Sequence, residues 1–100
     1  MIYITQLIYL REGQADLFNQ FEAIAIPAIL KYNGLLLLRV RPESYSYIEA
    51  SIEKPYEIHL VVFATDKDFD NFLQDDERKN FLHLKEQSIK STLLIKGMKL

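Results

Sequence analysis

The stretch LLLLRVRPESYSYIEASIEKPYEIHLVVFA, residues 35–64, decides the fold of this chain. Its two ends, Leu35–Arg41 and Tyr56–Ala64, are rich in aliphatic and aromatic residues and predict two strands, because such side chains pack well on a buried, pleated surface. Pro42 ends the first strand, and Ser44–Ile52 alternates only weakly, which indicates a short edge strand or an ordered excursion. The stretch therefore predicts a pair of strands in the middle of the chain.

A strand and a helix precede this pair. Ile2–Leu10 is dominated by β-branched and aromatic residues and predicts a strand. From Gln14 onward the apolar residues recur at spacings of three and four, which predicts one apolar stripe of an amphipathic helix. The stripe consists of Phe18, Phe21, Ala25, Ala28, Ile29 and Tyr32. Pro27 predicts a kink in this helix, and Asn33-Gly34 predicts its end, because both residues tolerate positive φ.

A helical region and a final strand follow the pair. Thr65 or Asp66 is suited to cap a helix that buries Phe69, Phe72 and Leu73. The run Asp75-Asp76-Glu77 has the composition of a second helix start, so the region is expected to form two helical pieces. Thr92–Leu100 returns to strand character.

The order strand, helix, strand, strand, helix, strand predicts an α+β, ferredoxin-like βαββαβ domain over residues 1–100, with a four-stranded antiparallel sheet and two helices on one face. The other sheet face would expose large apolar residues, such as Leu35, Leu37, Val61 and Phe63 if they lie on that side. A patch of this size is seldom left exposed on a monomer. The sequence therefore predicts a homodimer through the open sheet face, closed as a dimeric α/β barrel.

Composition excludes several classes of function. A net charge of −2 gives no electrostatic basis for binding nucleic acid, and the absence of cysteine excludes disulfides, thiolate metal sites and a cysteine nucleophile. No apolar run approaches the roughly 20 residues that span a bilayer, and no leader is recognisable at the amino terminus, so we expect a cytoplasmic protein without a membrane partner.

The run from Gly34 to Gly97 resembles the uncharacterised bacterial family of dimeric α/β-barrel proteins related to the antibiotic-biosynthesis monooxygenases. The similar pieces are Arg39 and Arg41, Val62-Phe63, Asp68-Phe69, Asp75-Asp76-Glu77-Arg78, Gly97 and, in the first helix, Ala25-Ile26-Pro27. The superfamily includes cofactor-free oxygenases, haem-degrading enzymes, isomerases and members with no known activity. The resemblance thus implies the fold and the dimer, while the chemistry has to be argued from the site.

Four polar residues are the candidates for catalysis. Glu57 and His59 share one face of their strand, Arg39 and Arg41 share one face of theirs, and antiparallel pairing could bring all four together. Such a group could bind an acidic or enolic oxygen and move a proton, with His59 as the base and an arginine stabilising the oxyanion. The alternative is a cross-strand salt bridge from Arg39 or Arg41 to Glu57, with His59 as a partly buried packing residue.

The candidates for ligand binding are Tyr9, Tyr56, Phe63 and Phe72. In related oxygenases aromatic and polar groups bind a polycyclic phenol, so the resemblance implies a small, hydrophobic, oxygenated ligand. The alternative is that the tyrosines are half-buried packing residues with hydrated hydroxyls.

No metal and no cofactor are expected. His83 and Glu86 lie three residues apart on one helix face, but two donors without a third do not make a specific metal site. Haem-degrading relatives carry a ligating histidine in this helix together with a tryptophan. This chain has no tryptophan, Phe72 takes its place, and the ligand position falls on Leu82, so haem binding is disfavoured.

Two functions remain open. The first is a small oxygenase-like or isomerase-like enzyme, or a binder, acting on a hydrophobic oxygenated molecule. The second is a non-catalytic structural or interaction module. A filled interior with Arg39, Glu57 and His59 mutually paired favours the module, whereas a pocket of several hundred Å³ lined by His59 and tyrosines favours the enzyme or binder.

Overall fold

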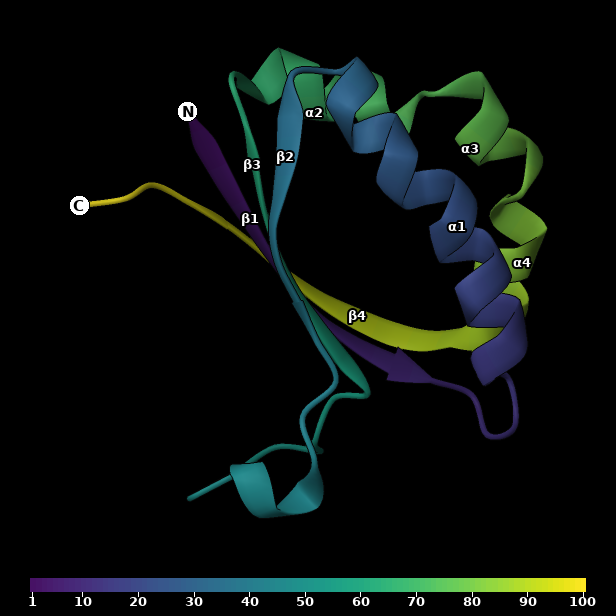
Figure 1. The fold of residues 1–100 in the computed structure, drawn as a ribbon, viewed down its shortest axis with the longest axis vertical. Coiled ribbons are helices and arrows are strands. Elements are labelled where there is room, and N and C mark those ends of the chain that lie inside the picture. Colours follow the sequence, from purple (N-terminus) through teal and green to yellow (C-terminus); the bar gives the residue numbers. More distant parts are fainter.

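Four antiparallel strands form one sheet in the computed structural model, which describes residues 1–100. They are β1 (Ile2–Leu10), β2 (Gly34–Val40), β3 (Glu57–Phe63) and β4 (Ile89–Gly97), in the order β2-β3-β1-β4 (Figure 1). The helices α1 (Ala15–Lys31), α2 (Asp66–Leu73), α3 (Asp76–Asn80) and α4 (Leu82–Ser88) all lie on one side of it. The predicted ferredoxin-like βαββαβ fold is thus confirmed, with three helical pieces before β4 where the sequence indicated two.

Side-chain caps divide the region after β3. The Thr65 hydroxyl accepts a hydrogen bond from the Asp68 amide at 3.1 Å and begins α2. The Asp75 carboxylate accepts from the Arg78 amide at 2.9 Å and begins α3. Each cap satisfies an N–H group that the first helical turn leaves unpaired. Both helix starts were predicted at these places, and the first falls on Thr65 rather than Asp66.

Helix α1 continues through Pro27 as one element. Proline removes the donor that would bond to the carbonyl of Ala23, but both residues are exposed, so water can satisfy that carbonyl. The helix ends where Asn33 adopts a φ of +59°. Gly34 has a different role from the one predicted, since a Cβ there would lie 2.6 Å from the Phe63 ring.

Strand β2 contains a bulge that the sequence alternation did not predict. Leu36 pairs with Val61, and the next partners are Leu38 and Leu60, so Leu37 is the extra residue. Strict alternation from Leu36 predicts that Arg39 lies on the other side of the sheet, but the extra residue at the bulge returns Arg39 to the side of Leu36. Arg39 consequently pairs with His59 on the face that the helices cover.

The core lies between this face and the helices. It consists of Ile2, Ile4, Ala28, Ile29, Val61, Phe63, Phe69 and Phe72. The possibility that Val61 and Phe63 belong to the open face is therefore wrong: they share strand parity with the buried Glu57 and His59.

The opposite sheet face carries a continuous set of apolar side chains, which we call the open face. Its members are Leu7, Leu35, Leu38, Val40, Ile58, Leu60, Val62, Leu93 and Ile95. Leu35, Leu38, Leu93 and Ile95, on the two edge strands, are about half exposed, and no element of this chain covers them (Figure 1). The excursion between β2 and β3 contains a short 3₁₀ turn, Ser44–Ser46, and projects away from the helical layer. None of the helices has the length and apolar character required to cross a membrane.

Candidate functional site

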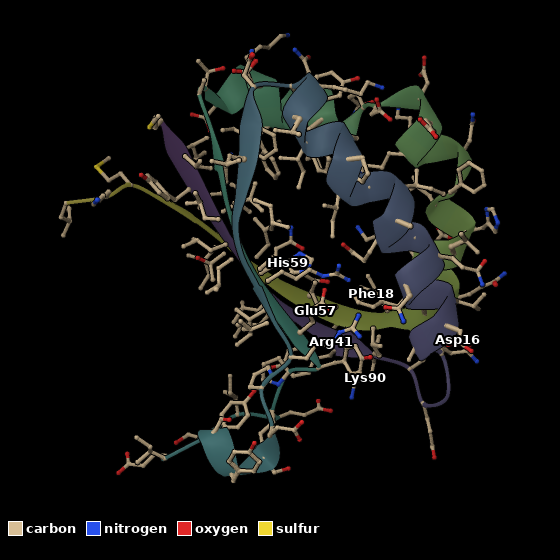
Figure 2. All side chains as sticks on the ribbon, in the orientation of Figure 1. Asp16, Phe18, Arg41, Glu57, His59 and Lys90 are labelled. Atoms are coloured by element: carbon tan, nitrogen blue, oxygen red, sulfur yellow. The ribbon has the colours of Figure 1, made fainter.

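Glu57 and His59 point from β3 into the space between the sheet and α1 (Figure 2). The pairing register explains this direction, because alternate residues of β3 face the helices and Val61 and Phe63 continue the same row. The side chain of Glu57 is completely buried and His59 is 4% exposed. A carboxylate and an imidazole in a protein interior require partners.

Both oxygens of Glu57 have such partners. Arg39 Nε donates to Oε2 at 2.9 Å and Arg41 Nε donates to Oε1 at 2.6 Å, while His59 Nε2 is hydrogen-bonded to Oε2. Burial raises the pKa of Glu57, but the hydrogen bonds from His59, Arg39 and Arg41 outweigh it and hold the pKa at about 2. The four predicted residues are therefore brought together, in the mutually paired arrangement that the salt-bridge alternative describes.

Arg41 is further fixed on its outer side. Its Nη2 donates to Asn19 Oδ1 at 2.6 Å, and its guanidinium lies 5.0 Å from the centre of the Tyr56 ring. The side chains of Arg39 and Arg41 are both partly exposed. The two arginines thus neutralise the charge of Glu57 without lining the interior cavity. His59 is the one member of the four that lines it.

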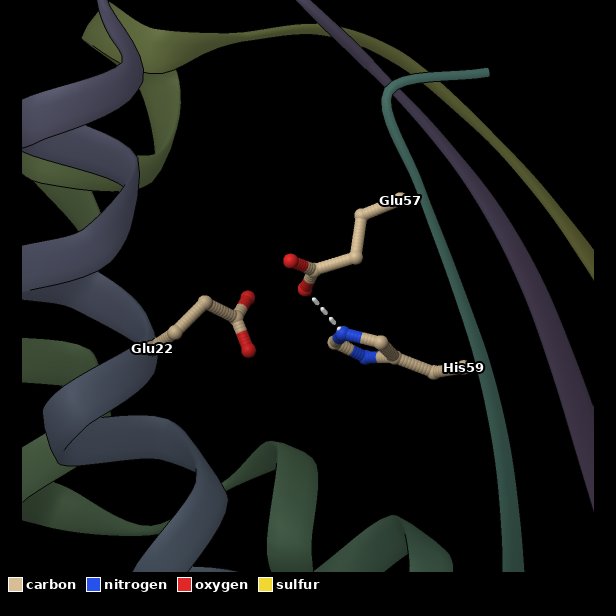
Figure 3. A group of neighbouring side chains, drawn as sticks. All are labelled: Glu22, Glu57 and His59. Carbon is tan, nitrogen blue, oxygen red and sulfur yellow. Dashed lines mark hydrogen bonds and ion pairs between the residues drawn. The ribbon is translucent and has the colours of Figure 1, made fainter. Parts of the chain in front are cut away.

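Glu22 of α1 completes the buried group, and it was not predicted (Figure 3). Its carboxylate, that of Glu57 and a nitrogen of His59 lie within 4.8 Å of one another. Glu22 is only 7% exposed, and burial raises its pKa against the opposing effect of His59. The signal was present in the sequence, since Glu22 is the charged residue that falls on the apolar stripe between Phe21 and Ala25.

A cavity of about 140 Å³ lies between the sheet and the helices, next to this group. Its walls are mainly apolar and include Phe63 and Phe72, two of the four candidates for ligand binding. Tyr9 and Tyr56 do not line it. The Tyr9 hydroxyl instead donates to the carbonyl of Glu53 at 2.7 Å, and the Tyr56 ring packs edge-on against Phe18. The strand register explains the position of Tyr9, which has the opposite parity to Gln6, a residue of the cavity wall.

Two further polar residues of the cavity wall were not predicted as site residues. Arg78 of α3 is 7% exposed and Lys85 of α4 is half-buried. Burial lowers the pKa of each, and in Lys85 the charge of Arg78 adds to that effect. The sequence indicates Arg78 only as part of the Asp75-Asp76-Glu77-Arg78 motif. Nothing in a five-residue helix distinguishes a buried arginine from a surface arginine.

Glu22, Glu57 and His59 have the spacing of metal ligands, although no metal was predicted. The electrostatics do not suit a divalent cation, because both oxygens of Glu57 already accept from arginines and the charges of Arg39 and Arg78 act on Glu22. His83 lies apart from this group, exposed on α4 beside Phe81.

Comparison with known proteins supports the fold. A protein of unknown function from Rhodopseudomonas palustris superimposes with a TM-score of 0.84 at 14% identity, over 99% of this chain and 82% of the other. A DABB family protein with a ferredoxin-like fold from Mesorhizobium loti gives 0.67 at 14%, over 99% and 96%. A Nitrosomonas europaea protein described as a candidate antibiotic biosynthesis monooxygenase gives 0.73 at 9%, over 100% and 99%.

The sequence comparisons add no relative. No family model matches the chain, and no curated protein matches it. The structural neighbours also include a NIPSNAP family protein of unknown function from Agrobacterium tumefaciens, with a TM-score of 0.68 at 16% identity, over 97% of this chain and 86% of the other. At these identities the similarity concerns the fold, and the resemblance inferred from the sequence is confirmed at that level.

Proposed function

We propose that the cavity binds a small oxygenated molecule built around a single ring and that His59 and Glu22 transfer a proton on it. The observation that carries this proposal is the approach of a buried imidazole and a buried carboxylate at the wall of an apolar cavity. Cavities of about 150 Å³ accommodate a benzene ring. The volume of about 140 Å³ therefore suits one ring rather than a polycyclic phenol.

The hydrogen bond to Glu57 prepares His59 for the role of base. Because the pKa of Glu57 is about 2, this carboxylate is ionised at neutral pH and accepts a hydrogen bond from Nε2–H of His59. With Nε2–H donated to Glu57, Nδ1 is the ring nitrogen left to accept a proton from a substrate. After Nδ1 accepts a proton, the Glu57 carboxylate stabilises the imidazolium, in the way that a buried acid supports a catalytic histidine.

Glu22 is suited to the complementary role of acid. Its raised pKa keeps a larger fraction of the carboxyl protonated than in an exposed glutamate. In a keto–enol isomerisation, His59 would take the proton from the carbon next to the carbonyl while Glu22 gives its proton to the carbonyl oxygen. Return of the proton from His59 to Glu22 resets the pair, and the reaction needs no oxidant, metal or cofactor.

Proton transfer can be measured with a single-ring α-keto acid. Phenylpyruvate is incubated with the protein, and enol formation is followed by absorbance and deuterium incorporation at carbon 3 by NMR. We expect catalysed exchange that falls 10²-fold or more in His59→Asn and Glu22→Gln, the usual contribution of a positioned acid or base. The exposed His83→Asn variant is the matched control and should retain full activity. Exchange at the uncatalysed rate with wild-type protein would contradict the proposal.

The non-catalytic module is the second candidate, and one observation favours it. Arg39, Arg41 and His59 satisfy Glu57 completely, as a structural salt-bridge network would. On this alternative the Glu22 and His59 variants would change stability alone.

We further propose that two copies of the chain associate through the open face. The support is its extent: the apolar set defined above spans all four strands, and its edge-strand members are about half exposed. Two sheets stacked face to face would enclose these side chains as the interior of a barrel.

A further inference from the structure

Arg78 is a buried cation that forms no ion pair, and the charges of Glu22 and Asp75 act on it only from a distance. It is 7% exposed, and none of the ion pairs in the structure includes it. Its one side-chain hydrogen bond runs from Nη1 to the carbonyl of Leu73 at 3.3 Å, and its Nε is buried with no partner. An unpaired buried charge is unfavourable, so such groups are nearly always paired or bind an ion.

Two aromatic rings fix the position of this guanidinium. It lies 5.7 Å from the centre of the Phe21 ring and 5.2 Å from that of Phe72. Contacts with aromatic faces stabilise the cation while leaving the N–H donors in the plane of the guanidinium free. Arg78 and both rings line the cavity. The free donors of Arg78 are therefore available at the cavity wall.

The other charged groups of the cavity do not neutralise Arg78. Lys85 adds a second positive charge from α4, and Glu22 is the one carboxylate in the lining. Glu22 and Arg78 interact at a distance without forming an ion pair, and the pKa of Glu22 is raised, which reduces the negative charge it contributes. Cations thus outnumber carboxylates on the cavity wall.

We infer that Arg78 anchors a carboxylate on the ligand, so that the molecule bound in the cavity is a small acid with a single-ring apolar body. A planar guanidinium donates two parallel hydrogen bonds to a carboxylate, which matches the unpartnered Nε and its neighbouring Nη. The volume of about 140 Å³ limits the apolar body to about one ring. This inference rests on the cavity of the proposed function and is independent of proton transfer.

Binding of benzoate and of methyl benzoate tests the inference by calorimetry. These probes differ in the negative charge and by one methyl group. We expect wild-type protein to bind benzoate at least tenfold more tightly than the ester. Arg78→Met should abolish that preference while leaving ester affinity within about threefold, and Arg78→Lys should retain part of it. Lys79→Met, which removes the exposed neighbouring cation, is the matched control and should behave as wild type.

A second measurement uses wild-type protein alone and does not depend on the folding of a variant. In ¹⁵N-labelled wild-type protein the Nε–H resonance of Arg78 should shift on addition of benzoate and stay unchanged with the ester. Equal affinity for the two probes, or an unshifted Nε–H signal at saturating benzoate, would overturn the inference. If His59→Asn binds benzoate normally but wild-type protein does not exchange phenylpyruvate, the anchor stands and the proposed proton transfer fails.

Discussion

Glu22 and His59 face each other from opposite layers of the domain, with a carboxylate oxygen of α1 and a ring nitrogen of β3 within 4.8 Å. Neither residue forms part of the apolar core cluster, although both are buried. A fold stabilised by packing has no need of a carboxylate at this point, because an apolar residue on the α1 stripe would fill it better. Residues that oppose stability in this way are typical of functional sites.

Substituting Glu22 by Gln is therefore expected to raise the melting temperature at pH 7.5. The pKa of Glu22 is raised in the folded chain by burial and by Glu57, and lowered to a smaller extent by His59, Arg39 and Arg78. An acid with a raised folded-state pKa destabilises the fold increasingly as pH rises above its unfolded-state value of 4.5. The difference between variant and wild type, measured by thermal denaturation, should vanish near pH 4. The exposed Glu12→Gln is the control, and an unchanged or lower melting temperature for Glu22→Gln would refute this.

Substituting Glu57 by Gln should have the opposite effect. The pKa of Glu57 falls from 4.5 to about 2 on folding, which corresponds to about 3 kcal/mol of stability at neutral pH. Because the folded-state pKa is depressed, this stability is present above pH 4.5 and lost as pH falls toward 2. Urea denaturation of wild type should show that decline, and Glu57→Gln should be less stable at pH 7 with a flatter profile. The exposed Glu49→Gln is the control; a wild-type profile for Glu57→Gln would be inconsistent with the network.

Two glycine-to-alanine substitutions should have different effects on the free energy of unfolding. A Cβ on Gly34 would lie 2.6 Å from Phe63 and 2.7 Å from Ile29, whereas one on Gly97 would meet nothing within 4 Å. Gly34→Ala should therefore lower the free energy of unfolding by about 1–3 kcal/mol, the usual range for an overpacked core. Gly97→Ala should leave it unchanged or raise it slightly, since alanine restricts the unfolded chain. Chemical denaturation of both variants checks the pair, and similar losses would argue against close packing at Gly34.

The proposed dimer can be disrupted on the open face. Leu38→Glu and Leu93→Glu place charges on two edge strands, and each should convert a dimer into a monomer at micromolar concentration. Leu30→Glu alters a more exposed leucine on α1, outside the open face, and should leave the mass unchanged. Light scattering gives the mass directly. A monomeric wild-type protein, or a dimer lost at high salt alone, would contradict association through an apolar face.

The fold could be predicted from the sequence because each strand and helix carries its own periodicity. Glu57 and His59 could be predicted to share a face because β3 alternates regularly, whereas the side on which Arg39 and Arg41 lie depends on the bulge in β2. Glu22 was missed because only the apolar residues of the helix stripe were interpreted, and Arg78 because its burial arises from how three short helices pack. The dimer, the cytoplasmic location and the absence of a nucleic-acid partner stay predictions.

The bulge at Leu37 gives the charged network a role in specifying the structure. Edge strand β2 is almost uniformly aliphatic, so packing alone would distinguish poorly between neighbouring registers. If β2 slipped by one residue to a regular ladder, Leu38 would stand opposite His59 and both arginines would turn outward. Glu57 would then be buried without counter-ions, which is strongly unfavourable. The ion pairs thus determine the register of β2, which its aliphatic side chains alone would leave poorly defined.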